Sequence, residues 1–506
     1  MKKSTLWNII CAAVLGLQLI AEGFALAIIL RLNMLPGIYT AALIAMFGLL
    51  GLLSGLLLFL HRKGKQVGTV RRIIACILAF LIVCGCAAVT VVVSQVYDTM
   101  HGITNPTVEK VTRSIYVRME DPAQSLADAA DYTFAIVDNY DVESTQQAIA
   151  VIESELGKEI PVECFLTITD MIDALYEEQV DAIILNSSYI AILEDNPDYA
   201  DFTQKARILH DVPVVGWTAP TETVAPEPTE EPAVIPDVTN TPFIMYISGS
   251  DTRSSYLPTS TRSDVNILVV VNPVTKQVLL LNTPRDYYVE NPAGNGVRDK
   301  LTHCGVYGID CSIKALENLY NLDVDYFAKI NFSGFETMID AVGGVTVYSD
   351  VSFTACGATW ISAGENYLNG KEALDFSRER YTLAGGDNAR GKNQMKVIKA
   401  VIEKLTSGTT IIANYSAILD SMKGMFTTSM EMLDISMLVK MQLSDMARWN
   451  ILSYAVTGQN GSNVTYSAPG EYLSIMYVND ELVAHAADLV DRVIAGEILT
   501  EEDLKD

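Results

Sequence analysis

Three long apolar runs open the chain and dominate its hydropathy pattern. Residues 6–30 are interrupted by Asn8, Gln18 and Glu22, and residues 38–60 and 73–93 contain no charged side chain. Each run is long enough to cross a hydrocarbon core of about 30 Å at about 1.5 Å per residue. The pattern therefore predicts a membrane anchor of three transmembrane helices in residues 1–96.

Basic residues flank these runs unevenly. Lys2 and Lys3 precede the first run, and Arg31 stands alone between the first and second. Five basic residues lie between the second and third runs: Arg62, Lys63, Lys65, Arg71 and Arg72. The positive-inside rule predicts a cytoplasmic N-terminus, and everything after about residue 95 outside the cell. A cleaved signal peptide explains the first run less well, because that run is too long and two more spans follow.

Strand-like and helix-like segments alternate in the first external region. Strands are expected at 132–137, 162–168, 182–185 and 206–212, with helices at 142–156 and 171–178. This βαβαβ order predicts a small parallel sheet covered by helices, while residues 97–130 show no clear pattern. The segment has no glycine-rich phosphate loop and no nucleophile elbow, and it resembles one lobe of periplasmic solute-binding proteins. We expect an accessory domain at 97–217 with a structural or partner-binding role.

A segment rich in Pro, Thr and Glu, residues 218–242, follows and is expected to be an extended linker. A larger domain, 243–495, then begins with apolar strands at 243–247, 265–271 and 277–281. Helices are predicted at 312–320, from 387 onward, and at 418–425, 437–446 and 482–494. A Gly/Asn-rich interruption lies at 458–463, and residues 496–506 are expected to form a charged tail.

Charge is distributed unevenly along the chain. The formal net charge is −26, but residues 1–97 carry +7, so the remainder carries −33. Such an acidic body argues against nucleic-acid binding. Four basic residues nevertheless gather within fifteen positions: Arg378, Arg380, Arg390 and Lys392. Guanidinium groups near a helix start suit phosphate or pyrophosphate, although they could instead pair with Glu379 and Asp387 on a solvated surface.

Carboxylates add a second candidate feature. Asp251 and Asp264 lie beside strand ends and could ligate Mg²⁺, a cation that also binds phosphate oxygens. The alternative is loop capping or salt bridges with neighbouring arginines. On the helix that starts near 387, Asp387, Arg390 and Gln394 share one face at spacing i, i+3, i+7.

The cysteines and histidines show no zinc-site spacing. Four of the eight cysteines lie in the membrane region. Cys304, Cys311 and Cys356 are near enough in sequence for a disulfide if this part is external, and the pairing stays open. His303 is expected to be a packed histidine and not a catalytic base.

The ordered set of motifs resembles the LytR–CpsA–Psr family over about residues 243–405. The first half comprises Gly-Ser-Asp-Thr-Arg (249–253), Arg-Ser-Asp (262–264), Pro-Arg-Asp (284–286) and Asp-Lys-Leu (299–301). The second half comprises Val-Gly-Gly-Val (342–345), Leu-Asn-Gly-Lys-Glu-Ala-Leu (368–374), Arg-Glu-Arg (378–380) and Gly-Asp-Asn-Ala-Arg-Gly-Lys-Asn-Gln (386–394). Members often have one span, so three spans depart from the simplest architecture.

This resemblance implies an α/β catalytic domain, an α-β-α sandwich with a central mixed sheet, outside the membrane. It implies a phosphotransferase that moves a glycopolymer from an undecaprenyl-pyrophosphate carrier onto peptidoglycan. The partners would be a polyprenyl-pyrophosphate-linked glycopolymer, peptidoglycan and the bilayer. A polyprenyl-pyrophosphate hydrolase and a non-catalytic wall-precursor sensor or transcription attenuator are the alternatives.

The resemblance also assigns roles to individual residues. Asp251 and Asp264 would hold Mg²⁺ (or Mn²⁺) against the pyrophosphate. The cationic clamp would comprise Arg285, Arg378, Arg380 and Arg390 as catalytic residues, with Arg262 and Lys300 binding substrate. Asp387 and Gln394 would hold these side chains in place.

Overall fold

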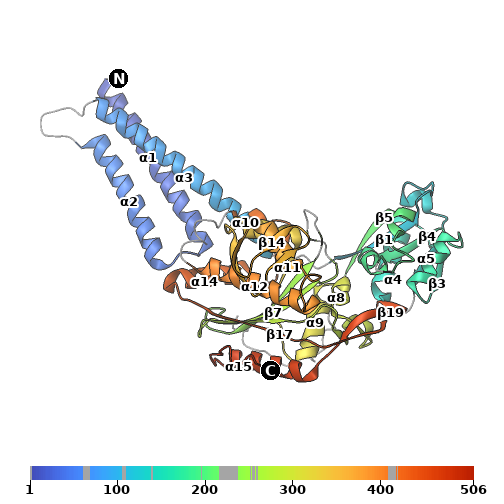
Figure 1. Ribbon diagram of the computed structural model, residues 1–506. Coiled ribbons are helices and arrows are strands. Elements are labelled where there is room, and N and C mark those ends of the chain that lie inside the picture. The colour runs from blue at the N-terminus through green and yellow to red at the C-terminus, as the bar shows by residue number, and fades with distance from the viewer. Residues whose placement is uncertain are drawn as a thin grey trace, which may run out of the picture.

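The computed structural model describes most of the chain: residues 3–60, 69–104, 110–137, 141–194, 196–215, 237–250, 252, 257, 260–407, 417–418 and 420–505. Asp251, Arg253 and most of the 218–242 linker lie outside these residues. Figure 1 shows three helices projecting from one end of a mixed α/β body, with a smaller α/β unit at the other end.

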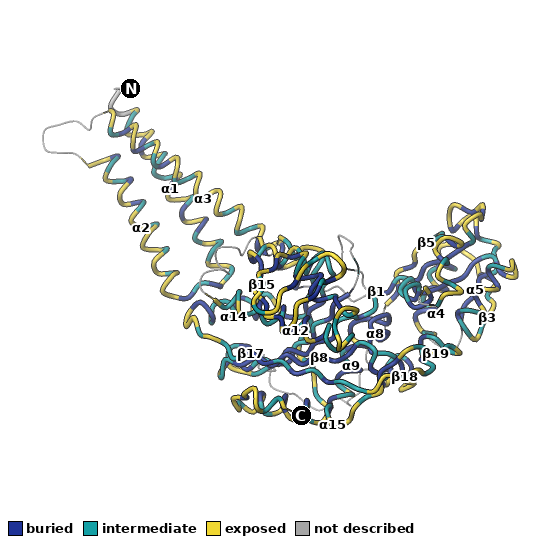
Figure 2. Tube along the Cα trace, in the orientation of Figure 1, coloured by how far each residue is buried: buried dark blue, intermediate teal, exposed yellow. Residues whose placement is uncertain are grey.

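The three projecting helices are α1 (Lys3–Leu32), α2 (Gly37–Phe59) and α3 (Thr69–Thr104). Each is long and apolar enough to cross a membrane, which confirms the prediction of three spans. Their outward surfaces are exposed along most of their length (Figure 2). The helix α3 continues eleven residues past the predicted end at Val93, and its buried Met100 and Ile103 pack with Phe426 of the large domain.

The accessory unit contains one five-stranded sheet in the order β3-β2-β4-β1-β5. Its elements are β1 (Lys110–Arg118), β2 (Phe134–Val137), α4 (Val142–Leu156), β3 (Val162–Phe165), α5 (Ile168–Tyr176), β4 (Ala182–Asn186), α6 (Ile190–Leu193), α7 (Phe202–Lys205) and β5 (Ala206–Val215). The predicted strands β2, β3, β4 and β5 run in the same direction, as expected, but β1, which was not predicted, lies antiparallel between β4 and β5 and makes the sheet mixed. The sequence did not predict β1 because the strand contains polar residues, and these are buried in the sheet. Arg113 pairs with Asp141, and Ser114 donates to Asp211.

The large domain is built on a six-stranded mixed sheet in the order β16-β11-β6-β7-β8-β17. The strands are β6 (Phe243–Ser250), β7 (Val265–Asn272), β8 (Gln277–Asn282), β11 (Tyr326–Asn331), β16 (Phe426–Thr428) and β17 (Asn450–Ala455). Along β7, Leu268 and Val270 belong to one core and Ile267 and Val269 to another. Burial on both faces explains the uninterrupted apolar run in the sequence.

Helices cover both faces of this sheet, so the domain is an α-β-α sandwich, as the family resemblance implied (Figure 1). The helices α9 (Ile309–Tyr320) and α15 (Asp480–Ile494) pack on one face, and α12 (Gly386–Thr406) packs on the other. The remaining elements of the domain are β9 (Tyr288–Glu290), β10 (Arg298–Lys300), α8 (Leu301–Cys304), α10 (Phe332–Ala341), β12 (Val345–Ser349), β13 (Phe353–Ala355), β14 (Thr359–Ile361), β15 (Gly364–Leu368), α11 (Gly370–Arg378) and α14 (Met432–Asp445).

The structure of the C-terminal region differs from the prediction in two places. The Gly/Asn-rich interruption at 458–463 is part of a hairpin, β18 (Gln459–Thr465) with β19 (Ala468–Tyr477). The start of the expected tail is anchored: Leu499 is buried, and its backbone N–H donates to Gln277 Oε1 at 2.8 Å. Leu499 lies in the large core and Leu504 packs against it, so apolar residues within a charged sequence fix this segment to the domain.

Candidate functional site

The site centres on Asp264, at the start of β7, and Arg285, on the loop that follows β8. These strands are antiparallel neighbours, with Ile267 opposite Asn282, so the start of one and the end of the other share a sheet edge. Arg285 Nη1 donates to Asp264 Oδ1 at 2.9 Å, and Thr302 Oγ1 donates to the same oxygen at 3.2 Å. Strand pairing thus brings two of the sequence-predicted residues together.

One guanidinium group, that of Arg285, contacts Asp264, and two more, those of Arg262 and Arg390, lie close enough to act on its charge. Burial by itself would raise the pKa of this carboxyl, but Arg285, Arg262 and Arg390 outweigh that effect and hold the pKa below its usual value. Asp264 is therefore ionised at neutral pH. Its charge draws together cations from three separate parts of the chain.

A second carboxylate, Asp286, links Arg285 to Lys300. Lys300 Nζ lies 2.6 Å from Asp286 Oδ1, and Arg285 Nε lies 3.8 Å from Asp286 Oδ2. Burial would lower the pKa of Arg285, but Asp264 and Asp286 raise it above its usual value. Asp286 and Thr302 are contributors that the sequence reading left out of the site, although Asp286 stands in the Pro-Arg-Asp motif.

The first turns of α12 bring Arg390 into the same cluster. Gly391 lies so close to the end of β8 that a Cβ there would be 2.4 Å from Asn282 Nδ2, so any other residue would force the Asn282 amide to move. Arg390 Nη2 lies 2.5 Å from Asp387 Oδ1, and both side chains are mostly buried. Burial lowers the pKa of Arg390, and the nearby Arg285 and Arg380 lower it further. Positive charge is thus concentrated at this point.

Arg378 and Arg380 lie at the end of α11. The guanidinium carbon of Arg378 is 4.6 Å from the centre of the Phe332 ring. Arg380 lies over Tyr381 at 4.8 Å and donates to its hydroxyl at 2.7 Å. The sequence left open that these arginines form ion pairs with Glu379, but such ion pairs do not account for the position of Glu379. The buried Glu379 instead accepts backbone N–H groups from Cys356, Tyr381 and Thr382.

An apolar cavity of about 340 Å³ lies beside the cationic cluster, between the sheet and the helices α10, α11 and α12. Its walls include Met245, Val269, Phe335, Leu374, Ile398 and Val401. Arg378 and Gln394 also line it, so Gln394 faces this cavity and shares it with a clamp residue. Met422 and Phe426 line the cavity and also belong to the core that contains Met100 and Ile103 of α3. The cavity wall thus continues into the contact with a membrane helix.

The carboxylates around the cluster suit Mg²⁺ in part. Among the residues described by the structure, no three His, Cys, Asp or Glu side chains gather as a metal site. Mg²⁺ does not require such a set, because it commonly keeps waters and uses one or two carboxylates together with substrate phosphates. The ionised Asp264 fits that role, whereas Asp251 lies outside the described residues.

The nearby histidine and cysteines are packed into the core. His303 Nδ1 lies 2.6 Å from Asp299 Oδ1, and both side chains are buried, in keeping with a packed histidine. Cys304 and Cys311 are both buried, and a side-chain hydrogen bond joins them. Cys356, in contrast, is exposed. All three are free thiols in the structure.

Comparisons with known proteins agree with this picture of the large domain. Residues 218–478 match the model of the LytR_cpsA_psr family. A polyisoprenyl-teichoic acid–peptidoglycan teichoic acid transferase TagU of Enterococcus faecalis is 33% identical over 195 residues, covering 38% of this chain and 63% of that protein. The TagU of Bacillus licheniformis is 37% identical over 164 residues, covering 32% of this chain and 52% of that protein.

The chain thus matches less than two thirds of the length of either relative. Among solved structures, TagT bound to LIIa-WTA aligns with 52% of this chain and 95% of its own, at 25% identity and a TM-score of 0.42.

Proposed function

Because the chain belongs to the LytR_cpsA_psr family, we propose that its large domain is a phosphotransferase acting on a lipid-linked glycopolymer. The donor is a polymer attached to a polyprenyl pyrophosphate, and the acceptor is a hydroxyl of peptidoglycan. The related TagU proteins, named for teichoic acid transfer to peptidoglycan, support this choice of substrates.

One observation carries the proposal: a cationic cluster adjoins an apolar cavity whose wall continues to a membrane helix. A diphosphate joined to a long hydrocarbon chain has two parts that match these two environments: the diphosphate is anionic, and the hydrocarbon chain is apolar. Arg262, Arg285 and Arg390 suit the phosphate oxygens, and the cavity lined by Val269 and Ile398 suits part of the tail. Arg378 and Gln394 lie where the two environments meet.

The chemistry follows from this placement. An acceptor hydroxyl attacks the phosphorus that bears the sugar, a new phosphodiester bond forms, and the phosphoanhydride bond to the lipid phosphate breaks. The lipid monophosphate leaves and the hydroxyl loses its proton. Negative charge grows on the bridging oxygen during this step, and fixed guanidinium groups stabilise that charge without having to reorganise. An enzyme outside the cell needs no nucleotide for this step, because its donor carries the activated bond.

Asp264 and Asp251 would hold Mg²⁺, which when bound supplies further positive charge at the pyrophosphate. The polar contacts of the chain itself orient the clamp: Asp387 holds Arg390, while Asp264 and Asp286 hold Arg285. We propose that this site lies on the outer face of the cell membrane, which is the side that the distribution of basic residues favours.

The test uses the full chain purified in detergent, with a polyprenyl-pyrophosphate-linked wall polymer and peptidoglycan fragments. Polymer covalently attached to peptidoglycan, lost on treatment with EDTA and restored by Mg²⁺, supports the proposal in full. Attachment that resists EDTA removes the metal from it. Phosphate release without attachment indicates the hydrolase. No reaction, with tight binding of the lipid, indicates the sensor.

A further inference from the structure

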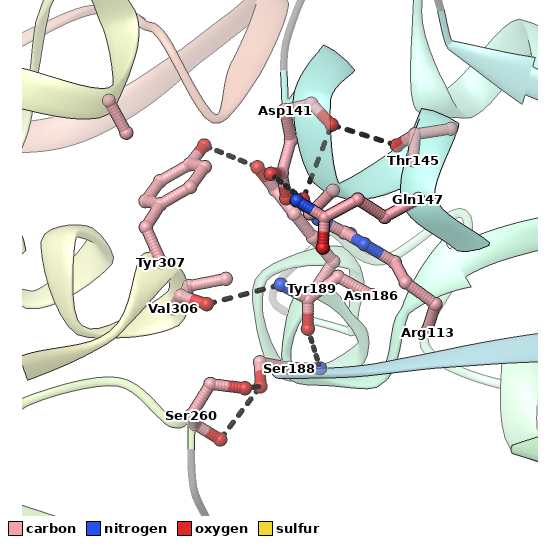
Figure 3. A network of polar contacts seen from close by, with 12 residues as sticks. Arg113, Asp141, Thr145, Gln147, Asn186, Ser188, Tyr189, Ser260, Val306 and Tyr307 are labelled. Atoms are coloured by element: carbon pink, nitrogen blue, oxygen red, sulfur yellow. Dashed lines mark hydrogen bonds and ion pairs between the residues drawn. The ribbon is translucent and has the colours of Figure 1, made fainter. Parts of the chain in front are cut away.

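The accessory unit packs directly on the edge of the large domain that carries the candidate site. Figure 3 shows Ser188 facing Ser260 and Asn186 facing the carbonyl group of Val306. Ser188 Oγ lies 2.7 Å from both Ser260 O and Ser260 Oγ, and Asn186 Nδ2 donates to Val306 O at 3.1 Å. These polar contacts follow directly after β4, at the end of the accessory sheet that faces the large domain.

Aromatic side chains reinforce the contact. The hydroxyl groups of Tyr189 and Tyr307 are hydrogen bonded to each other, and Tyr307 also bonds to Ser467 Oγ at 3.0 Å. Tyr189, Tyr307 and Asn186 are almost completely buried. Ile192 and Leu193 of the accessory unit join the same apolar core as Val306 and Met476. The two units therefore share a core, and the contact between them is not a loose tether.

This contact reaches the site through the short segment 260–263. Arg262 Nη1 donates to the backbone carbonyl of Ala191, on α6 of the accessory unit, at 3.3 Å. On its other side the segment is fixed by α8: Thr261 N donates to Gly305 O, and Ser263 N donates to Thr302 O. A Cβ at Gly305 would lie 2.5 Å from Thr261 O, so the segment lies tightly against this side. Segment 260–263 is thus clamped between the two units.

Arg262 is one of the three guanidinium groups around Asp264. We propose that the accessory unit is a positioning element of the active site: Ser188 and the Ala191 carbonyl hold segment 260–263 and thereby aim Arg262 at the pyrophosphate of the donor. This inference rests on the proposed transferase function. It assigns Ser188 as a positioning residue, since Ser188 acts through Arg262 and touches no substrate.

A double-mutant cycle in the full chain tests the inference. Ser188→Ala removes the hydroxyl that bonds to Ser260, and we expect kcat/KM for the lipid-linked donor to fall about tenfold, as for one well-placed hydrogen bond. Arg262→Ala should cost about a hundredfold. In the double variant the loss should equal that of Arg262→Ala alone, because the serine acts through the arginine. Ser188→Thr keeps the hydroxyl and should restore most of the activity.

Glu163→Gln, at an exposed position of the edge strand β3 and separated from β4 by β2, is the matched control and should behave as the wild type. Affinity for the polyprenyl-pyrophosphate donor, measured by titration calorimetry, should fall in parallel with kcat/KM. The inference is overturned if the two losses of kcat/KM multiply in the double variant, or if Ser188→Ala is fully active. In either case, transfer by the wild type still upholds the proposed function. Absence of transfer by the wild type counts against the proposed function itself.

Discussion

Arg285 and Asp264 form a hydrogen-bonded ion pair of 2.9 Å at the edge where the antiparallel strands β7 and β8 meet. The pair is mostly buried and is flanked by Arg262, Arg390 and Thr302. Four cations, Arg262, Arg285, Arg390 and Lys300, face three carboxylates, Asp264, Asp286 and Asp387, so the cluster retains positive charge for an anionic ligand. The pair therefore organises the site and leaves it able to bind a pyrophosphate.

The retained charge predicts a large effect of removing one arginine. Arg285→Ala or Arg390→Ala should lower kcat for polymer transfer by about 10² to 10³, because each removes a preorganised cation at the point where charge develops. Arg448→Ala is the matched control, since Arg448 is exposed and lies outside the cluster, and it should leave kcat unchanged. Initial rates of polymer attachment to peptidoglycan measure the effect. An equal loss of kcat in all three variants would show instead that the effect comes from the general loss of positive charge.

The apolar cavity predicts a dependence on the length of the lipid. Ala328, on β11, lines the cavity, and a phenyl group there would occupy part of the space. Ala328→Phe should raise KM for a donor with a long polyprenyl tail about tenfold, and should leave KM for a donor with a two-isoprene tail nearly unchanged. Ala358→Phe, on the exposed turn between β13 and β14, controls for the added bulk. Equal changes for both donors would place the tail elsewhere.

The main strands and helices of the large domain could be predicted because their local patterns agree with their burial. The strands β6, β7 and β8 are short apolar runs between turn residues, and α12 has apolar positions at helical spacing. Arginines gathered in one acidic chain favour an anion site, and the anion itself stays a prediction. The convergence of Arg262, Arg285 and Arg390 could not be derived from spacing, because it depends on strand pairing and on the close approach of Gly391 to Asn282.

The elements that sequence reasoning missed are stabilised by distant partners. The strand β1 buries Arg113 because Asp141 and Ser144 satisfy it from another element. The strand β18 is mostly polar, and it is held as a strand by antiparallel pairing with β19. The cavity and the contact between Ala191 and Arg262 likewise arise from tertiary packing, for which no local signal exists.

The buried pair of Asp299 and His303 predicts how stability depends on pH. Burial would raise the pKa of Asp299, but His303 and Ser467 outweigh it and hold the pKa below its usual value. A carboxyl with a depressed pKa stabilises the fold fully above its unfolded pKa of about 3.9, and the contribution disappears as the pH falls through the folded value. Asp299→Asn should therefore cost about 3 kcal/mol at neutral pH.

The measurement is the midpoint of thermal unfolding of the full chain in detergent, for wild type and Asp299→Asn, from pH 7 to pH 3. The difference between the two should stay constant down to about pH 5 and shrink below about pH 4. Asp323→Asn, an exposed carboxyl on the same domain, should show no difference at any pH. A difference that already disappears near pH 6 would contradict this account.

The cysteines offer a combined test of packing and membrane orientation. Cys356 and Cys164 are exposed, whereas Cys304 and Cys311 are buried against each other. A membrane-impermeant maleimide added to right-side-out vesicles should therefore label Cys356 and Cys164 if these domains are external. Partial burial of the thiol and the neighbouring Asp375 raise the pKa of Cys356, so its labelling should speed up as the pH rises from 7 to 8.5, because the thiolate is the reactive form. Cys356→Ser and Cys164→Ser identify the two sites by mass spectrometry.

Cys304 and Cys311 should resist the reagent in the folded chain, because the hydrogen bond between them and burial raise the pKa of Cys304 well above its usual value. After unfolding without a reductant, both should react, because they are free thiols in the structure, and a failure of both to react would reveal a disulfide. Labelling of Cys356 only after the vesicles are opened would place the large domain on the cytoplasmic side. That result would exclude a peptidoglycan acceptor, since peptidoglycan lies outside the membrane.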